Sequence, residues 1–101
     1  MLEAEWQKIA IAYLKAHPQV AFITASDSDR KRHQKYRCGK AGHPDLHGFT
    51  RCGRALYVEL KKPSGGTASS AQKRFINEAR NFNVKCGFAR TTFDLEAILA
   101  Q

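Results

Sequence analysis

The chain has 101 residues, of which 43% are hydrophobic and 26% charged, as expected for one globular domain. No run approaches the roughly 20 apolar residues of a membrane span, and the first residues lack the basic-then-apolar pattern of a signal peptide, so membrane insertion and secretion are disfavoured. The net charge of +8 points instead to a polyanionic partner.

The first part of the chain predicts a helix, a strand and a long loop. Apolar side chains recur at helical spacing on one face, and Pro18 ends the helix after them: Leu2, Trp6, Ile9 and Tyr13. Residues 20–24 are rich in β-forming side chains and predict a strand. Residues 26–42 are polar and basic without a clear period, which predicts a mobile loop.

The rest of the chain predicts two strands, a helix, a strand and a helix. Residues 43–50 and 55–62 read as strands joined by a turn at residues 51–54, in which Gly53 supplies a positive φ. Ser69 and Gln72 form a capping box for a helix over residues 69–82, whose apolar face is Ala71, Phe75, Ala79 and Phe82. A strand over 84–91 and a helix over 93–100 complete a single α-β-β-β-α-β-α domain of the α/β class, covering residues 1–101.

The positive charge is concentrated in the centre of the chain. Residues 30–62 hold ten basic and two acidic side chains, whereas the two flanking segments nearly cancel one another. Such a basic field is typical of nucleic-acid binding, although a solvated basic surface is the simpler alternative. The side chains that we expect to contact DNA phosphates are Arg30, Lys31, Arg32, Lys35, Arg37, Lys40 and Lys62. Tyr36 lies among them and could stack on an exposed base.

The two acidic residues of this segment, Asp45 and Glu59, suggest chemistry. Alternation in a strand places Glu59 and Lys61 on one face, about 7 Å apart. Two converging carboxylates can bind Mg²⁺ or Mn²⁺, and a neighbouring lysine can orient a metal-bound water or balance charge on a phosphate. The pattern predicts a metal-dependent nuclease, with a structural ion pair on the sheet as the alternative.

Pro44-Asp45 followed by Glu59-Leu60-Lys61 resembles the PD-(D/E)XK nuclease motif, and the order of elements resembles that fold's core. The chain is more specifically similar to a stand-alone VRR-NUC domain. The stretches that carry this similarity are Glu5-Trp6-Gln7, Gly42-His43-Pro44-Asp45, residues 57–63 and Gln72.

The resemblance implies a restriction-endonuclease-like core, with a four-stranded mixed sheet flanked by helices. It implies that Asp45, Glu59 and the Leu60 carbonyl bind Mg²⁺ or Mn²⁺, and that Lys61 is the catalytic lysine. Glu5 would approach the metal from the first helix, and Gln72 would reach the site from the second. It further implies a homodimer that cleaves four-way (Holliday) junctions in DNA and leaves 5′-phosphate and 3′-hydroxyl ends.

Three residue assignments have alternatives. Glu3 and Glu5 lie on opposite edges of the apolar stripe of the first helix, so periodicity does not choose between them, and either one could simply interact with the helix dipole. Gln72 could serve only as a helix cap. A rival function is a zinc-stabilised or catalytically silent DNA-binding module, in which the zinc ligands would be Cys38, His43, His47 and Cys52.

Three cysteines without a signal peptide disfavour a disulfide framework. A reducing cytoplasmic location, compatible with a microbial or viral context, is therefore expected.

Overall fold

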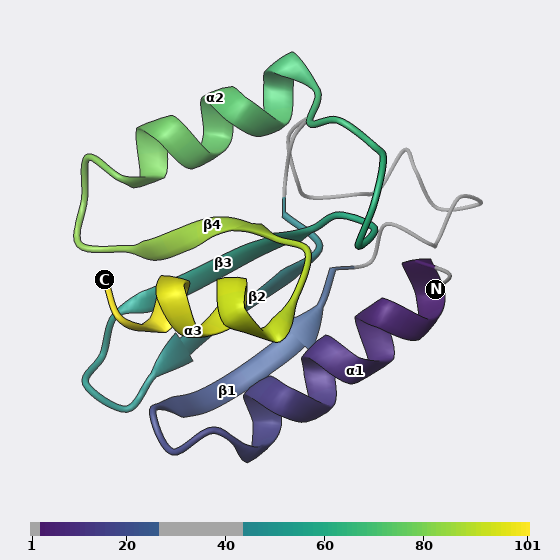
Figure 1. Cartoon of the computed structure of the whole chain (residues 1–101). Coiled ribbons are helices and arrows are strands. Elements are labelled where there is room, and N and C mark those ends of the chain that lie inside the picture. Colours follow the sequence, from purple (N-terminus) through teal and green to yellow (C-terminus); the bar gives the residue numbers. More distant parts are fainter. Residues whose placement is uncertain (1–2, 27–43) are drawn as a thin grey trace.

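The computed structural model describes residues 3–26 and 44–101, which form one four-stranded sheet with three helices (Figure 1). The expected α/β class and order of elements are confirmed. The elements in chain order are α1 (Glu3–Ala16), β1 (Val20–Ala25), β2 (Leu46–Thr50), β3 (Ala55–Leu60), α2 (Ser70–Ala79), β4 (Lys85–Ala89) and α3 (Thr92–Leu99). Among these residues, no helix is long and apolar enough to cross a membrane.

The sheet is mixed, as expected, with the strand order β1-β2-β3-β4. β1 pairs with β2 and β2 with β3 in antiparallel fashion, whereas β3 and β4 are parallel. A parallel pair needs a crossover connection, and α2 supplies it. The turn between β2 and β3 contains Gly53 at a φ of 90°, which confirms the expected turn.

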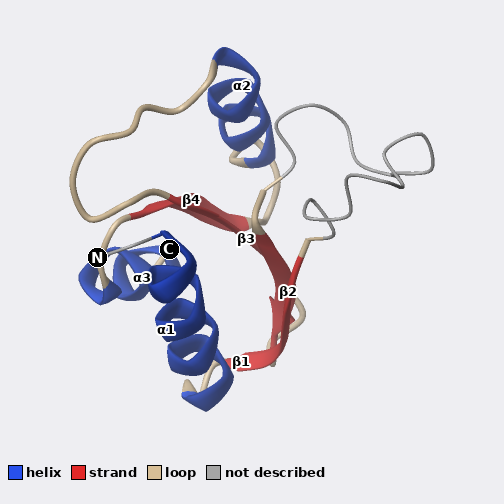
Figure 2. Cartoon of the chain, turned by 90° about the vertical axis from the view of Figure 1, so that its right-hand side faces the viewer, coloured by secondary structure: helices blue, strands red, loops and turns tan. Residues whose placement is uncertain are grey.

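The main core lies between one face of the sheet and the helices α1 and α3. Figure 2 shows these two helices on the concave side of the curved sheet, with α2 on the other side near β4. Leu56, Val58 and Leu60 of β3 all belong to this core, so the expected alternation of β3 is confirmed. In the part of the chain that the structure describes, β1 is an edge strand, and an open groove of about 320 Å³ runs along residues 20–24.

The buried face of α1 differs from the expected one. Trp6, Ala10 and Leu14 face the core, while Ile9 is exposed and Tyr13 is half-buried. The helix carries apolar side chains on more than one face, so its sequence period does not determine its rotation. Packing does: the Trp6 indole nitrogen donates a hydrogen bond to the Ala89 carbonyl at the end of β4 (3.1 Å).

The second helix is shorter than expected, and Ile76 is buried beside the expected Phe75 and Ala79, which are half-buried. α2 ends at Ala79, so Phe82 lies beyond it and is exposed, and Ile76 is the buried residue. Phe75 packs edge-on against Tyr57 of β3, with ring centroids 5.3 Å apart. The capping box is confirmed, because the Ser69 hydroxyl accepts a hydrogen bond from the Gln72 amide and the Gln72 side chain accepts one from the Ser69 amide.

Glu96 of α3 contacts Tyr13 and His17 at the C-terminal end of α1, and we expect the stability that this contact provides to depend on pH. Its carboxylate accepts a hydrogen bond from the Tyr13 hydroxyl and contacts His17 Nε2 at 2.9 Å. The Tyr13 hydrogen bond, followed by the charge of His17, lowers the pKa of Glu96. A lowered carboxyl pKa stabilises the fold above the unfolded-state value, and this stability is lost as the pH falls through the folded-state value.

Glu96→Gln should therefore lower the free energy of unfolding at pH 6, and the difference from the wild type should shrink as the pH falls below about 4.5. Urea unfolding across this pH range measures it. Glu78→Gln, at an exposed position of α2, is the matched control and should change stability little at any pH. An effect of Glu96→Gln that is constant from pH 3 to pH 6 would contradict the assignment.

Candidate active site

Asp45 lies immediately before β2, at the end of the sheet where β3 finishes. β2 begins at Leu46, slightly later than expected, so Asp45 itself is outside the strand. The Asp45 carboxylate accepts a hydrogen bond from the Leu60 amide (2.9 Å), and its carbonyl accepts one from the Ser26 amide (2.7 Å). These two bonds hold the Asp45 carboxylate beside the last residues of β3.

Glu59 is almost completely buried, with 2% of its surface exposed. Burial raises its pKa to about 9, and the hydrogen bond with Asp45 and the Asp45 charge act in the same direction, against the charge of Lys61. Among the described residues, its Oε2 atom has no hydrogen-bond partner. Such a buried carboxyl oxygen is costly unless something pairs with it. The structure thus brings Asp45 and Glu59 together, as the sequence predicted.

Lys61 follows Glu59 on the same side of the chain, and its ammonium group is held by neutral oxygens. It donates to the Gln72 side-chain oxygen at 2.8 Å and to the Thr67 carbonyl at 3.4 Å. Within residues 3–26 and 44–101, Lys61 forms no close ion pair with Asp45 or Glu59, although its charge lowers the pKa of Glu59.

Gln72 is the helix cap that the sequence predicted and also contacts Lys61, while its role in catalysis stays a prediction. Its side-chain oxygen accepts the Ser69 amide within the capping box and also accepts the Lys61 ammonium group. The start of α2 therefore fixes the position of Lys61. Sequence periodicity alone did not reveal this, because the local capping signal explained Gln72 completely.

The charge of Glu3 in α1 makes a small contribution to the raised pKa of Glu59. Glu3 and Glu5 are both exposed. The role of Glu5 as a metal ligand stays a prediction, and Glu3 stays the alternative that the sequence left open.

Arg90 is a site-supporting residue that the sequence analysis missed. Its guanidinium group donates to the carbonyls of Lys62 and Gly66 (both 2.8 Å) and also to that of Gly65. It thereby fixes the loop that follows Lys61, in which both glycines have positive φ values. The Gly65-Gly66 pair indicates a turn in the sequence. Arg90, which hydrogen-bonds to this turn, lies about 25 residues away in the chain, so the sequence did not reveal the contact. Lys62 itself is exposed.

The zinc site proposed from sequence is not supported. His47 Nδ1 lies 3.4 Å from the Ser26 hydroxyl, whereas the Cys52 sulfur lies 3.2 Å from the Thr50 hydroxyl at the other end of β2. Strand geometry separates His47 from Cys52 by at least about 10 Å, too far for one tetrahedral ion. Within residues 3–26 and 44–101, no group of three or more His, Cys, Asp or Glu residues could hold a metal. Cys38 and His43 lie outside the described residues.

The six basic residues expected in the loop also lie outside the described residues, as does Tyr36. They are Arg30, Lys31, Arg32, Lys35, Arg37 and Lys40. Their proposed contacts with DNA therefore stay predictions.

Comparisons with known proteins identify the family and the fold. The sequence model of the VRR-NUC domain matches residues 6–92. A solved structure described as a VRR_NUC domain protein superimposes with a TM-score of 0.70 at 22% identity, covering 100% of this chain and 87% of that one. No protein with a curated description matches the sequence. Because the match spans most of the chain, including Asp45, Glu59, Lys61 and Gln72, the chain belongs to the VRR-NUC family and has that family's nuclease-type fold.

Proposed function

We propose that this protein is a metal-dependent, structure-specific endodeoxyribonuclease that prefers branched DNA, above all four-way junctions. The observation that carries the proposal is the buried Glu59 carboxyl, which lies beside Asp45 and has an Oε2 atom without a partner among the described residues. Lys61 and Gln72 complete the group. The net charge of +8 favours a polyanionic substrate.

The residues of the site fit a Mg²⁺ or Mn²⁺ ion. Asp45 and Glu59 offer carboxylate oxygens, which these hard cations prefer. A cation would stabilise the ionised form of Glu59, whose pKa is raised by burial and then by the hydrogen bond and the charge of Asp45. The Leu60 carbonyl and a glutamate of α1, Glu5 or Glu3, are the further ligands that we propose. Two side-chain ligands completed by water are usual for magnesium at phosphate-processing sites.

The other residues would bind and orient the substrate. A divalent cation at this site would supply the Lewis acidity that activates water and stabilises charge on the phosphate. The Lys61 ammonium, held by Gln72 and Thr67, would donate to the attacking water or to a non-bridging phosphate oxygen. The attacking water would lose one proton to solvent as its oxygen forms a bond to phosphorus and the P–O3′ bond breaks. The departing O3′ would take a proton from solvent, leaving 5′-phosphate and 3′-hydroxyl ends.

The substrate class is tested with purified protein on a four-way junction, a flap and a linear duplex of the same sequence, each with Mg²⁺, Mn²⁺ or EDTA. We expect cutting only with the metal ions, and faster cutting of the junction. Cutting that persists in EDTA would overturn the metal mechanism, and equal rates on junction and duplex would overturn the preference. Binding without any cutting would identify a catalytically silent DNA-binding module.

We further propose that the protein acts as a homodimer, because paired cuts on a four-way junction need two active sites related by two-fold symmetry. Light scattering at micromolar concentration should give the mass of two chains. A monomeric mass at that concentration, together with junction cleavage, would overturn this assembly.

The contribution of α1 is tested by Glu3→Gln and Glu5→Gln, compared in the same assay. Because Glu3 acts electrostatically on Glu59, we expect Glu3→Gln to slow cleavage by roughly 10- to 100-fold, and Glu5→Gln measures the contribution of the ligand that the family resemblance implies. The apparent affinity for Mn²⁺ should fall in parallel. A greater loss in Glu5→Gln would restore the original assignment of Glu5.

A further inference from the structure

Two phenylalanine rings form an exposed apolar patch on the sheet. Phe22 of β1 and Phe49 of β2 are paired across the strands, and their rings stack with centroids 5.6 Å apart and planes 27° from parallel. Each side chain is about half exposed, at 48% and 50%. Contiguous exposed aromatic surface of this kind commonly marks a binding site.

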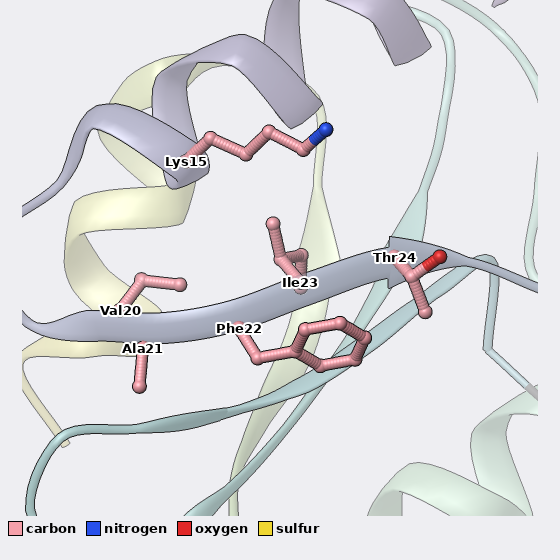
Figure 3. Close-up of a pocket in the computed structure, with 6 residues that line it drawn as sticks. All are labelled: Lys15, Val20, Ala21, Phe22, Ile23 and Thr24. Atoms are coloured by element: carbon pink, nitrogen blue, oxygen red, sulfur yellow. The ribbon is translucent and has the colours of Figure 1, made fainter.

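The patch lies on the face of the sheet that α1 and α3 do not cover. Figure 3 shows Val20 and Ile23 on the side of β1 that carries Lys15 of α1, and Phe22 on the opposite side. On β2, Leu46 faces the core and Phe49 is exposed. Among the described residues, the helix on this face is α2, which packs beside β3 and β4 through the Phe75–Tyr57 contact (Figure 2).

The same face carries the candidate active site. Side chains alternate along β3, so Tyr57, Glu59 and Lys61 point away from the main core. The register pairs His47 with Tyr57 and Phe49 with Ala55. The two phenylalanine rings therefore lie on the same face of the sheet as Glu59, further from the end of β3 at which the candidate active site lies. Asp45 and Phe49 are four residues apart in the chain, which corresponds to a distance of about 13 Å along a strand. This distance is close to that spanned by four stacked nucleotide steps.

The electrostatic surroundings of the patch suit a nucleic acid. The described segments that form it, residues 17–26 and 46–58, contain no Asp or Glu. Arg51 and Arg54 follow Phe49 at the end of β2, whereas Lys15 lies on the opposite side of β1. Aromatic rings stack on bases while nearby cations attract the phosphate backbone, which is the usual combination for binding unpaired nucleotides.

We propose that Phe22 and Phe49 form a stacking platform for unpaired bases of the DNA substrate, a few nucleotides from the scissile phosphate. This inference rests on the proposed nuclease function and sharpens its substrate class. DNA with unpaired bases near the cleavage point gains the stacking energy, whereas bases inside a continuous duplex remain stacked on one another and cannot reach the rings. The platform thereby favours DNA with a single-stranded branch over a continuous duplex.

The test measures binding in EDTA, so that it does not depend on cleavage. The probes are a duplex with a single-stranded tail containing 2-aminopurine, in both tail polarities, and the same duplex with blunt ends. We expect the wild type to quench 2-aminopurine in the tail. Phe22→Ala and Phe49→Ala should lose this quenching and bind the tailed duplex roughly 5- to 100-fold more weakly, while binding of the blunt duplex should change by less than about 2-fold.

Two kinds of control make the result specific. Phe82→Ala and Phe93→Ala remove rings that are 74% and 86% exposed on other parts of the molecule, and should leave the quenching intact. Phe49→Tyr retains an aromatic ring and should restore binding, whereas Phe49→Leu retains only apolar surface and should not. Equal losses for the tailed and blunt probes, or rescue by leucine, would overturn the stacking role.

Light scattering of the same variants separates DNA from a protein partner. A dimer that becomes monomeric in Phe22→Ala or Phe49→Ala would show that a second copy covers the rings and would overturn the platform. If the wild type cuts branched DNA and the variants bind and cut it normally, the platform fails while the nuclease function stands. If no DNA is cut but tail quenching depends on Phe22 and Phe49, the nuclease function fails and the platform stands.

Discussion

Replacing Glu59 by glutamine should abolish DNA cleavage and at the same time stabilise the metal-free protein. The loss of activity follows from the loss of a proposed metal ligand, and should exceed the roughly 10- to 100-fold losses typical of residues that only support ligands. The gain in stability follows from the raised pKa of Glu59, about 9, in the folded protein. A residue whose role is only structural would change activity and stability in the same direction.

The sign of the stability effect depends on pH. In the unfolded chain Glu59 ionises near its ordinary pKa of 4.5, whereas in the folded protein it ionises near 9. Unfolding therefore releases a proton between these values, so the free energy of unfolding falls as the pH rises from about 4.5 to 9. Glutamine is neutral at every pH, so the free energy of unfolding of Glu59→Gln should not fall in this way as the pH rises. The glutamine amide can also donate a hydrogen bond to the Asp45 carboxylate.

Thermal unfolding in EDTA at pH 5 and pH 8 measures the effect. Glu59→Gln should melt several degrees above the wild type at pH 8 and much closer to it at pH 5, and Glu78→Gln serves as the exposed control. Adding Mn²⁺ should stabilise the wild type and release up to one proton per bound ion, but should have little effect on Glu59→Gln. A variant that melts below the wild type at pH 8 would contradict the burial and charge argument.

Replacing Gly48 by alanine should destabilise the whole fold. A Cβ atom at this position would lie 1.9 Å from the Phe22 carbonyl oxygen and 2.9 Å from the Ile23 Cα. Both atoms belong to the backbone of β1, so neither can move aside without breaking the pairing of β1 with β2. We expect a loss of about 3 kcal/mol or more in the free energy of unfolding, at the upper end of overpacking effects.

Gly53→Ala is the control for Gly48→Ala, because a Cβ there meets no atom within 4 Å. Its φ of +90° is unfavourable for alanine, which should cost only about 1–2 kcal/mol. Urea unfolding of both variants separates steric overlap from backbone strain. Equal losses in the two variants would show that β1 can shift away from Gly48.

The sequence by itself determined the order of the elements and the centre of the candidate site. Both follow from local signals. Pro18 follows the end of α1, and buried and less buried side chains alternate along much of β3. Gly53 forms the turn before β3, and Ser69 with Gln72 caps α2. Such signals act between residues that are close in the chain, so they can be identified without knowledge of the fold. Asp45, Glu59 and Lys61 stood out in the same way, as unusual charges within a basic segment.

Only the tertiary structure decided which faces the helices bury and which distant residues support the site. α1 is apolar on more than one side, so contact with the sheet selected Trp6, Ala10 and Leu14 in place of Ile9. Three such contacts join residues that are 11 to 28 positions apart in the chain. They are the hydrogen bond from Lys61 to Gln72, the hydrogen bond from Arg90 to the Lys62 carbonyl and the stacked Phe22–Phe49 pair. No local pattern encodes these contacts, because each depends on how separate elements pack against one another.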